Sequence, residues 1–340
     1  MATPSSNSKP TPEHIINTMN AYQQALALRT AVELDLFTKI ADGAADAAAI
    51  AKKTNASEKG VRTLCNYLVV LGFLTKQSEK YGLSQESAIF LNRHSPACMA
   101  AMTGFLTTDL IIKKFSSLTE AVKKGGSAAD HGDNLEPNDE MWVAFARSMG
   151  PLTTPSANFI AQLTGMPQGT ACKILDIAAG HGMYGITMAK HNANAEVTAL
   201  DWPNVLEVAK EHAQKAGVGE RFKTRPGSAF EAEFGEGYDF VLLTNIFHHF
   251  DQATCEKLMK RVHAALKSGG QAITLEFVPH EDRVSPPMPA MFSLVMLATT
   301  DTGDAYTFAE YEKMFRNAGF SKTTLHQIPE MPQQVLVSEK

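Results

Sequence analysis

The sequence has few cysteines, no long apolar run and no excess of positive charge. Its four cysteines are scattered through 340 residues without a C-x-x-C pair, which indicates neither a disulfide framework nor a zinc site. No stretch reaches the roughly 20 apolar residues that a membrane helix needs, and the N-terminus lacks the apolar segment of a signal peptide. Lys and Arg number 31 against 36 Asp and Glu, which disfavours nucleic-acid binding. We therefore expect a cytoplasmic protein without membrane or nucleic-acid partners.

The chain is long enough for more than one domain. Of its 340 residues, 44% are hydrophobic and 20% are charged, so it can build substantial cores. We expect a flexible tail, a winged-helix-like dimerisation domain, a helical connecting region and an α/β domain, spanning residues 1–12, 13–105, 106–165 and 166–340. A Gly-, Asp- and Asn-rich stretch, 123–140, predicts an exposed loop within the connecting region.

The N-terminal domain is expected to hold three helices and a hairpin. Apolar residues recur at every fourth position from Leu28 to Ile40, which predicts one helix over residues 22–40. A short helix over 46–53 follows, and Ser57 is placed to cap a third helix. The segment FLTKQSEKYGLS then predicts two strands joined by a polar turn, which completes a winged helix.

The third helix of this domain is poorly equipped to read DNA. It carries only Lys59 and Arg62 near its start and is apolar through LCNYLVVLGFL. A recognition helix needs several basic and amide side chains on its exposed face. We therefore expect the domain to pack against a second copy and make a homodimer.

From about residue 171 the chain alternates between strand-like and helix-like segments. The strand-like segments are KILDIA, EVTALD, FKTR, YDFVLLT and QAITLEF, and the alternation predicts parallel strands in a doubly wound sheet. Two further segments, TTLHQI and QVLVSE, are close in sequence and are expected to pair antiparallel at one edge. The predicted class is α/β, with a seven-stranded, mostly parallel sheet behind a mainly α domain.

A glycine-rich loop follows the first of these strands. Gly180, Gly182 and Gly185 form G-x-G-x-x-G, and Asp201 ends the next strand. Glycines let the backbone approach a ligand, and an acid at this spacing can bind the two hydroxyls of a ribose. The pattern predicts a ligand that contains a nucleoside, either NAD or S-adenosylmethionine.

Asp176, in the strand before the loop, distinguishes these two ligands. A carboxylate there would oppose the pyrophosphate of a dinucleotide, which binds at the helix N-terminus. S-adenosylmethionine instead carries an ammonium and a sulfonium, so the acid favours it through charge-assisted hydrogen bonding. An acid that only caps a turn is the alternative.

Four more residues lie where the adenine would bind. Trp202 can stack on the ring or belong to the core, and Ser228, in a segment with Ala229 and Phe230, can hydrogen-bond the adenine or only form a turn. All follow strands at the rim where ligands of open α/β folds bind.

The fourth strand ends in TNIFHHFD, which places His248 and His249 at the same rim. Attack by a phenol with a pKa near about 10 benefits from a base near neutrality, and imidazole fits that need. Glu276, at the end of the fifth strand, is placed to hold the imidazole tautomer. A metal site that also includes Asp251 is the weaker alternative, because a third ligand at metal spacing is missing.

Two apolar stripes at helical spacing flank the rim, and each is either helix core or one wall of a pocket for a planar apolar acceptor. Their members are Met141, Trp142, Phe145, Met149, Met288, Met291, Phe292, Val295 and Met296.

With these residues together, the chain resembles the class I S-adenosylmethionine-dependent O-methyltransferases, which join a winged-helix dimerisation domain to a Rossmann-like catalytic domain. Plant small-molecule methyltransferases and bacterial hydroxyindole and polyketide enzymes share this plan. The resemblance runs from about Asn20 to Val337 and is most specific in LDIAAGHGMYG, LDWPNV, PGSAF, NIFHHFD and YTFAEYEKMFRNAGF.

The resemblance implies roles for individual residues. It makes Asp201 the ribose acid, His248 the general base and Glu276 a carboxylate beside that base. The chain departs from the plant pattern at three positions: Ser228 replaces an acid for the adenine, Thr244 replaces a lysine, and Ala305 replaces a second acid beside the base. Asp304, next to Ala305, is a candidate substitute for that acid.

The predicted reaction is methyl transfer from S-adenosylmethionine to a hydroxyl of a small aromatic metabolite. Carbon, nitrogen or carboxylate methylation on the same fold remains an alternative because of the three departures. An NAD-dependent oxidoreductase and a winged-helix regulator that senses a ligand without turnover are the alternatives from other classes.

Overall fold

The computed structural model describes residues 10–128, 140–166 and 170–340. It forms two compact units, Met1–Thr108 and Asp109–Lys340. Each unit has its own hydrophobic core.

The first unit is a helical domain with a two-stranded hairpin. Its elements are α1 (Glu13–Glu33), α2 (Leu36–Ala41), α3 (Ala47–Thr54), α4 (Glu58–Val70), β1 (Leu74–Gln77), β2 (Lys80–Leu83), α5 (Gln85–Phe90) and α6 (Ala100–Leu106). The predicted hairpin is confirmed, with Leu74 opposite Leu83. The predicted cap is also confirmed, because the Ser57 side chain accepts a hydrogen bond from the Gly60 N–H.

The prediction of one helix over residues 22–40 is wrong. The chain breaks between α1 and α2, where Asp35 adopts a left-handed backbone with φ 52°. The apolar spacing continues through the break because Val32, Leu36 and Ile40 all enter the same core. The apolar spacing therefore correctly indicated residues of one core, but it could not indicate the turn at Asp35.

One face of α1 is apolar and exposed. Ile15, Met19 and Tyr22 are 63%, 68% and 62% exposed and lie at helical spacing. Large apolar side chains grouped on a surface are typical of protein–protein contacts.

The second unit begins with helices that lead to the sheet. They are α7 (Asp109–Ser116), α8 (Leu118–Lys124), α9 (Glu140–Met149), the 3₁₀ helix η1 (Gly150–Thr153) and α10 (Thr154–Leu163). Most of the loop expected over 123–140 lies outside the described residues.

The sheet of the second unit has seven strands in the order β5-β4-β3-β6-β7-β9-β8. The strands are β3 (Cys172–Ile177), β4 (Ala195–Asp201), β5 (Phe222–Pro226), β6 (Tyr238–Thr244), β7 (Leu266–Glu276), β8 (Lys322–Gln327) and β9 (Gln334–Glu339). β3 to β7 are parallel, whereas β9 pairs antiparallel with both β7 and β8. The predicted fold class, with its antiparallel edge pair, is confirmed.

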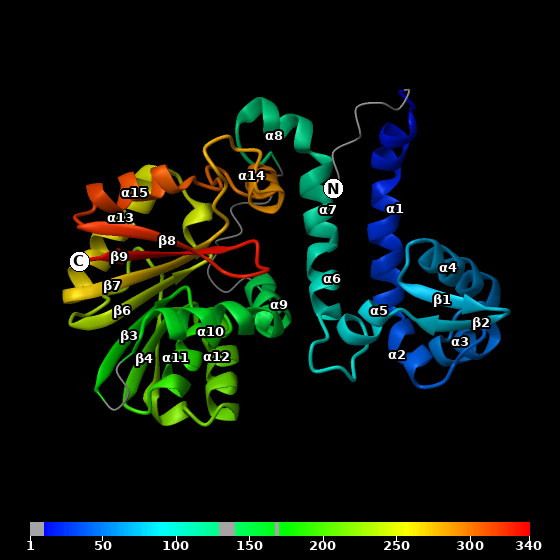
Figure 1. The fold of residues 1–340 in the computed structure, drawn as a ribbon, viewed down its shortest axis with the longest axis horizontal. Helices are drawn as coiled ribbons and strands as arrows, with labels where there is room; N and C mark the ends of the chain where they lie inside the picture. Colours follow the sequence, from blue (N-terminus) through cyan, green and yellow to red (C-terminus); the bar gives the residue numbers. More distant parts are fainter. Residues whose placement is uncertain (1–9, 129–139, 167–169) are drawn as a thin grey trace. The chain divides into compact units, whose positions relative to one another are not determined.

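Helices cover both faces of this sheet (Figure 1). α10, α11 (Met183–His191) and α12 (Pro203–Lys215) pack on one face. α13 (Gln252–Ala265) and α15 (Phe308–Asn317) pack on the other. The central strands are consequently apolar on both sides, as KILDI in β3 illustrates.

Strand order places a change of winding direction, where open α/β sheets form their ligand crevice, at the carboxyl ends of the parallel strands. β3 lies between β4 and β6, so the chain winds outward in one direction through β5 and returns in the other through β7. Ligands of open α/β sheets bind where the winding direction changes. The rims of β3, β4, β6 and β7 are therefore the place to look for a site.

The four cysteines are all free. Burial raises the pKa of the Cys65 and Cys172 thiols to about 11 and raises that of Cys255 further, whereas Cys98 is partly exposed. Among the described residues, no helix combines the length and the apolar character needed to cross a bilayer.

Candidate active site

The loop after β3 uses its glycines for two physical purposes. Gly180 and Gly182 have left-handed backbones, with φ 56° and 72°, which side chains rarely adopt. A Cβ on Gly185 would lie 2.7 Å from Val197 Cγ1, so this glycine lets α11 pack closely on β4. The turn therefore brings bare backbone to the crevice at the start of α11.

Asp176 lies beneath this loop and is completely buried. Its Oδ2 accepts a hydrogen bond from the Gly185 N–H at 3.1 Å, and its Oδ1 has no partner among the described residues. Burial raises the pKa of this carboxyl to about 7, and the nearby Asp201 adds to the rise. A buried acid with an oxygen still free to accept fits a cationic ligand group and opposes a pyrophosphate.

Asp201, at the end of β4, is joined directly to the glycine loop. Its Oδ2 accepts from the Gly180 N–H and its Oδ1 from the Trp202 N–H, both at 2.7 Å. Burial raises the pKa of Asp201 to about 6. Each carboxylate oxygen keeps a lone pair, so the pair of oxygens can still accept from two vicinal hydroxyls.

The residues expected near the adenine lie along the next part of the rim. Trp202 precedes α12 and packs against the small cluster of Ala146, Val205 and Val208. Ser228 Oγ accepts from the Phe230 N–H at 3.1 Å, so the hydroxyl holds its own turn. Ala229 is a partly buried neighbour in this turn, and Thr244 is buried at the end of β6.

His248 and Glu276 are in direct contact at the rim of β6 and β7. The His248 Nδ1–H donates to Glu276 Oε2 at 2.6 Å, and Glu276 Oε1 accepts from the Phe247 N–H at 2.9 Å. Both side chains are buried. Because an ionised carboxylate only accepts, the contact assigns the proton to Nδ1 and leaves the Nε2 lone pair to act as a base.

His249 is in a different environment. Burial and the neighbouring His248 lower the pKa of His249 well below its ordinary value. Its ring lies edge-on to Trp142 at 5.7 Å, and no carboxylate bonds to it among the described residues. A weak and unsupported imidazole is a poor base at neutral pH, so the geometry favours His248.

Aromatic rings lie beside the His248 imidazole. Phe292, on α14 (Pro287–Thr299), meets the His248 ring edge-on at 4.9 Å and stacks on Phe277 at 4.1 Å. Met296, from the same predicted stripe, is buried, whereas Met288 is 55% exposed. The apolar stripe on α14 therefore divides: Met296 lies in the core, Met288 lies on the surface, and Phe292 lies beside the His248 ring.

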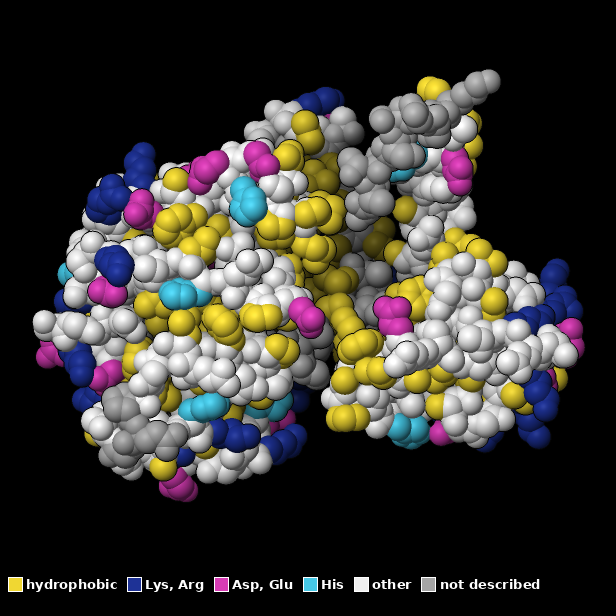
Figure 2. Space-filling model, viewed as in Figure 1, with side chains coloured by type: hydrophobic (Ala, Val, Ile, Leu, Met, Phe, Trp, Pro, Cys, Tyr) yellow, Lys and Arg dark blue, Asp and Glu magenta, His cyan; other side chains and the backbone are white. Residues whose placement is uncertain are grey.

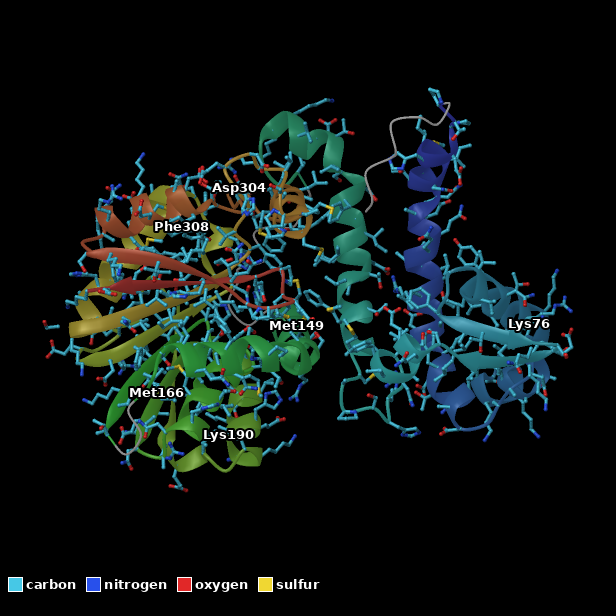
Figure 3. All side chains as sticks on the ribbon, in the orientation of Figure 1. Lys76, Met149, Met166, Lys190, Asp304 and Phe308 are labelled. Atoms are coloured by element: carbon cyan, nitrogen blue, oxygen red, sulfur yellow. The ribbon has the colours of Figure 1, made fainter. Side chains whose placement is uncertain are left out.

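Asp304 does not occupy the place of a second acid beside the base. It lies on the loop between α14 and α15, labelled in Figure 3. Its carboxylate accepts from Arg283 at 3.3 Å and from the Ala305 N–H at 2.8 Å, and no bond joins it to His248 among the described residues. Glu276 is accordingly the single carboxylate in hydrogen-bond contact with the base in this part of the chain.

Tyr184 is a polar residue that the sequence did not single out. It is buried in the first turn of α11, and its hydroxyl lies 3.2 Å from the Ser156 hydroxyl of α10. Burial raises the pKa of Tyr184, and the charge of Asp176 adds to the effect. Its place inside the G-x-G-x-x-G motif, between Gly182 and Gly185, was the available signal. Among the described residues, no three His, Cys, Asp or Glu side chains gather as metal ligands.

Comparisons with known proteins agree with this geometry. Residues 16–93 match the O-methyltransferase dimerisation domain, and residues 161–321 match the O-methyltransferase domain. A crystal structure assigned as an O-methyltransferase from Nostoc punctiforme is 49% identical and has a TM-score of 0.93, with 98% of this chain and 100% of that chain covered.

Two further relatives have names that state a methyltransferase activity. The S-adenosyl-L-methionine-dependent methyl transferase PigF of Serratia is 26% identical over 97% of this chain and 96% of its own, and its structure with SAH has a TM-score of 0.85. The 3-hydroxy-5-methyl-1-naphthoate 3-O-methyltransferase of Streptomyces sahachiroi is 26% identical over 87% of this chain and 85% of its own.

Proposed function

Since the chain belongs to the S-adenosylmethionine-dependent O-methyltransferases, we propose that it methylates a hydroxyl group of a small aromatic molecule with His248 as the general base. The observation that carries this proposal is the buried His248–Glu276 pair at the rim of the crevice. A naphthoate as the acceptor of one relative supports the aromatic class.

The cofactor residues follow from the glycine loop. S-adenosylmethionine supplies a methyl group on a positively charged sulfur. We assign its ammonium to Asp176 and its ribose hydroxyls to Asp201, with the bare backbone of Gly180 and Gly182 beside it. Trp202, Ser228, Ala229, Phe230 and Thr244 are proposed to line the remaining part of this pocket.

His248 and Glu276 would prepare the acceptor. Nε2 would take the proton of the attacking hydroxyl while its oxygen bonds to the methyl carbon and the bond from that carbon to the donor sulfur breaks. The imidazole becomes positively charged, and Glu276, 2.6 Å from Nδ1, stabilises that charge. Phe292 and Phe277 offer an apolar surface beside the base for a planar acceptor.

Isotope-labelled S-adenosylmethionine, offered with hydroxynaphthoates, hydroxyindoles, amines and carboxylates, tests the reaction class. We expect the label in a methyl ether. A label found only on carbon, nitrogen or a carboxylate would replace the proposed acceptor by one of the alternatives, and turnover with NAD in place of the methyl donor would overturn it.

His248→Ala tests the base. We expect turnover to fall roughly 10²- to 10⁴-fold with unchanged affinity for S-adenosylhomocysteine by calorimetry, because the base acts on the acceptor. His263→Ala is the matched control, because His263 lies on α13 against Phe320. Full activity of His248→Ala would exclude His248 as the base.

We also propose that the protein acts as a cytoplasmic homodimer. The match to the dimerisation domain and the exposed apolar face of α1 support self-association, and the four free cysteines suit a reducing compartment. On the face shown in Figure 2, Lys and Arg side chains lie in several separate places with Asp and Glu among them. A gel-shift with genomic DNA would detect the alternative regulator.

A further inference from the structure

A second contact holds His248, and it comes from a loop far away in the sequence. Gly303 lies between α14 and α15, against the main chain of His248 and His249. A Cβ built on Gly303 would lie 2.2 Å from the His248 carbonyl oxygen and 3.0 Å from the His249 carbonyl carbon. The third neighbour is the Thr300 side chain, whose Oγ1 would lie 2.6 Å away, but the two in the histidine turn are backbone atoms, which cannot swing aside as a flexible side chain can. The loop can lie this close only because Gly303 has no side chain.

The other side of the loop 300–303 lies equally close to a second glycine, Gly126. A Cβ on Gly126, just after α8, would lie 2.1 Å from the Asp301 carbonyl oxygen. The Ser127 N–H donates to the Thr300 carbonyl at 2.7 Å, and the Gly303 N–H donates to Thr300 Oγ1 at 2.9 Å. Three layers of backbone are thus stacked: the end of α8, the loop 300–303 and the turn that carries His248.

We propose that Gly303 is a positioning residue for His248, with the loop 300–303 holding the main chain of the base while Glu276 holds its ring. The inference rests on the proposed role of His248 as the base. Glu276 fixes the imidazole through Nδ1 from the sheet side, whereas the loop fixes the His248 carbonyl from the helix side. With both contacts, Nε2 has one direction in which to face an acceptor.

The cost of disturbing this contact follows from the distances. A carbon atom at 2.2 Å from the His248 carbonyl oxygen must move away by roughly 1 Å to reach ordinary contact. A displacement of about 1 Å in a catalytic group reduces turnover by about 10²-fold. Gly303 does not have a left-handed backbone, so alanine disturbs the contact without straining its own φ.

The test compares Gly303→Ala with Gly219→Ala. The control glycine lies in the same unit, and its Cβ would meet Gln214 Cγ at an ordinary 3.4 Å. We expect Gly303→Ala to lower kcat about 10²-fold with KM for S-adenosylmethionine and calorimetric affinity for S-adenosylhomocysteine within about twofold of the original protein. Gly219→Ala should match the original protein in all three quantities.

A readout that needs no acceptor is the His248 Nδ1–H proton signal in protein labelled with isotopic histidine, assigned by its loss in His248→Ala. We expect Gly303→Ala to displace this signal and Gly219→Ala to leave it in place. An unmoved signal, or an unchanged kcat in folded Gly303→Ala, would overturn the inference.

Thr300→Val covers the case in which Gly303→Ala does not fold. It removes the 2.9 Å bond that closes the loop, together with the 2.8 Å bond from the Thr300 hydroxyl to the Met296 carbonyl, while keeping the side-chain shape. We expect kcat to fall about fivefold, as for the loss of the bond that closes the loop, with the same displaced proton signal. An unchanged kcat and signal in this variant would also overturn the inference.

The failure of this inference can be distinguished from failure of the proposed function. If His248→Ala is inactive while the Gly303 and Thr300 variants are normal, the proposed base stands and the role of Gly303 is refuted. A fully active His248→Ala refutes both.

Discussion

The unfolding free energy of Asp176→Asn, compared with that of the original protein, should increase as the pH rises, although the substitution damages the cofactor site. The Asp176 carboxyl is completely buried, and burial raises its pKa from 3.8 to about 7. The folded protein therefore holds this proton more tightly than the unfolded chain does. The resulting contribution to stability is fully present below about pH 4 and is lost as the pH rises to about 7.

The size of this change follows from the two pKa values. At about 1.4 kcal/mol for each pH unit, a rise from 3.8 to about 7 corresponds to about 4 kcal/mol. Asparagine cannot ionise, so the variant does not lose this contribution, and its amide adds only an offset that does not vary with pH. Asp201, with its pKa raised to about 6, titrates in both proteins, but its charge is one cause of the Asp176 shift, so the difference also contains the interaction between the two carboxyls.

Urea unfolding without cofactor, followed by circular dichroism between about pH 4.5 and about pH 8, measures the difference. The unfolding free energy of Asp176→Asn relative to the original protein should rise across this range by about 3 kcal/mol, because the rest of the change falls below about pH 4.5. Its dissociation constant for S-adenosylhomocysteine should increase about 10-fold or more, because a charge-assisted hydrogen bond is lost. A stability difference that stays flat with pH would refute the assignment of a costly buried carboxylate.

Three further outcomes can be checked with standard assays. Glu276→Gln should lower kcat roughly 10²- to 10⁴-fold in steady-state kinetics because the imidazole tautomer is no longer set, and a normal kcat would contradict the role of the 2.6 Å bond. Asp201→Asn should weaken S-adenosylhomocysteine binding about 10-fold in calorimetry, since one acceptor for the ribose is lost, and equal affinity would remove Asp201 from the site. Met19→Asp should convert dimers to monomers in light scattering, because a charge would enter the apolar face of α1; an unchanged mass would locate the interface elsewhere.

Much of the fold and part of the site followed from local patterns in the sequence. Alternating strand and helix segments predicted the parallel sheet, and short spacing predicted the antiparallel β8–β9 pair. The rule that parallel strands end at one rim predicts that His248 and Glu276 lie together, and the 2.6 Å bond between them confirms it. Asp176 was found in the same way, from its place in the strand before the glycine loop.

Other features depend on the conformation of single loops and could not be predicted. The break at Asp35 is one left-handed residue inside an uninterrupted apolar pattern. Asp304 was a candidate acid for the base, yet the loop directs it to Arg283. The contact of Gly303 with His248 joins two loops that lie 55 positions apart in the sequence. A single glycine in a sequence does not indicate which backbone segment it will approach.

The unequal burial of the cysteines gives the protein a natural attachment point. Three thiols are buried, with pKa values raised, so they are slow to form the reactive thiolate, whereas Cys98 is partly exposed between α5 and α6. A maleimide spin label would therefore attach at one position in each native subunit. In a homodimer, two such labels would report a single distance between subunits, so the association of the N-terminal units can be mapped without introducing any new cysteine.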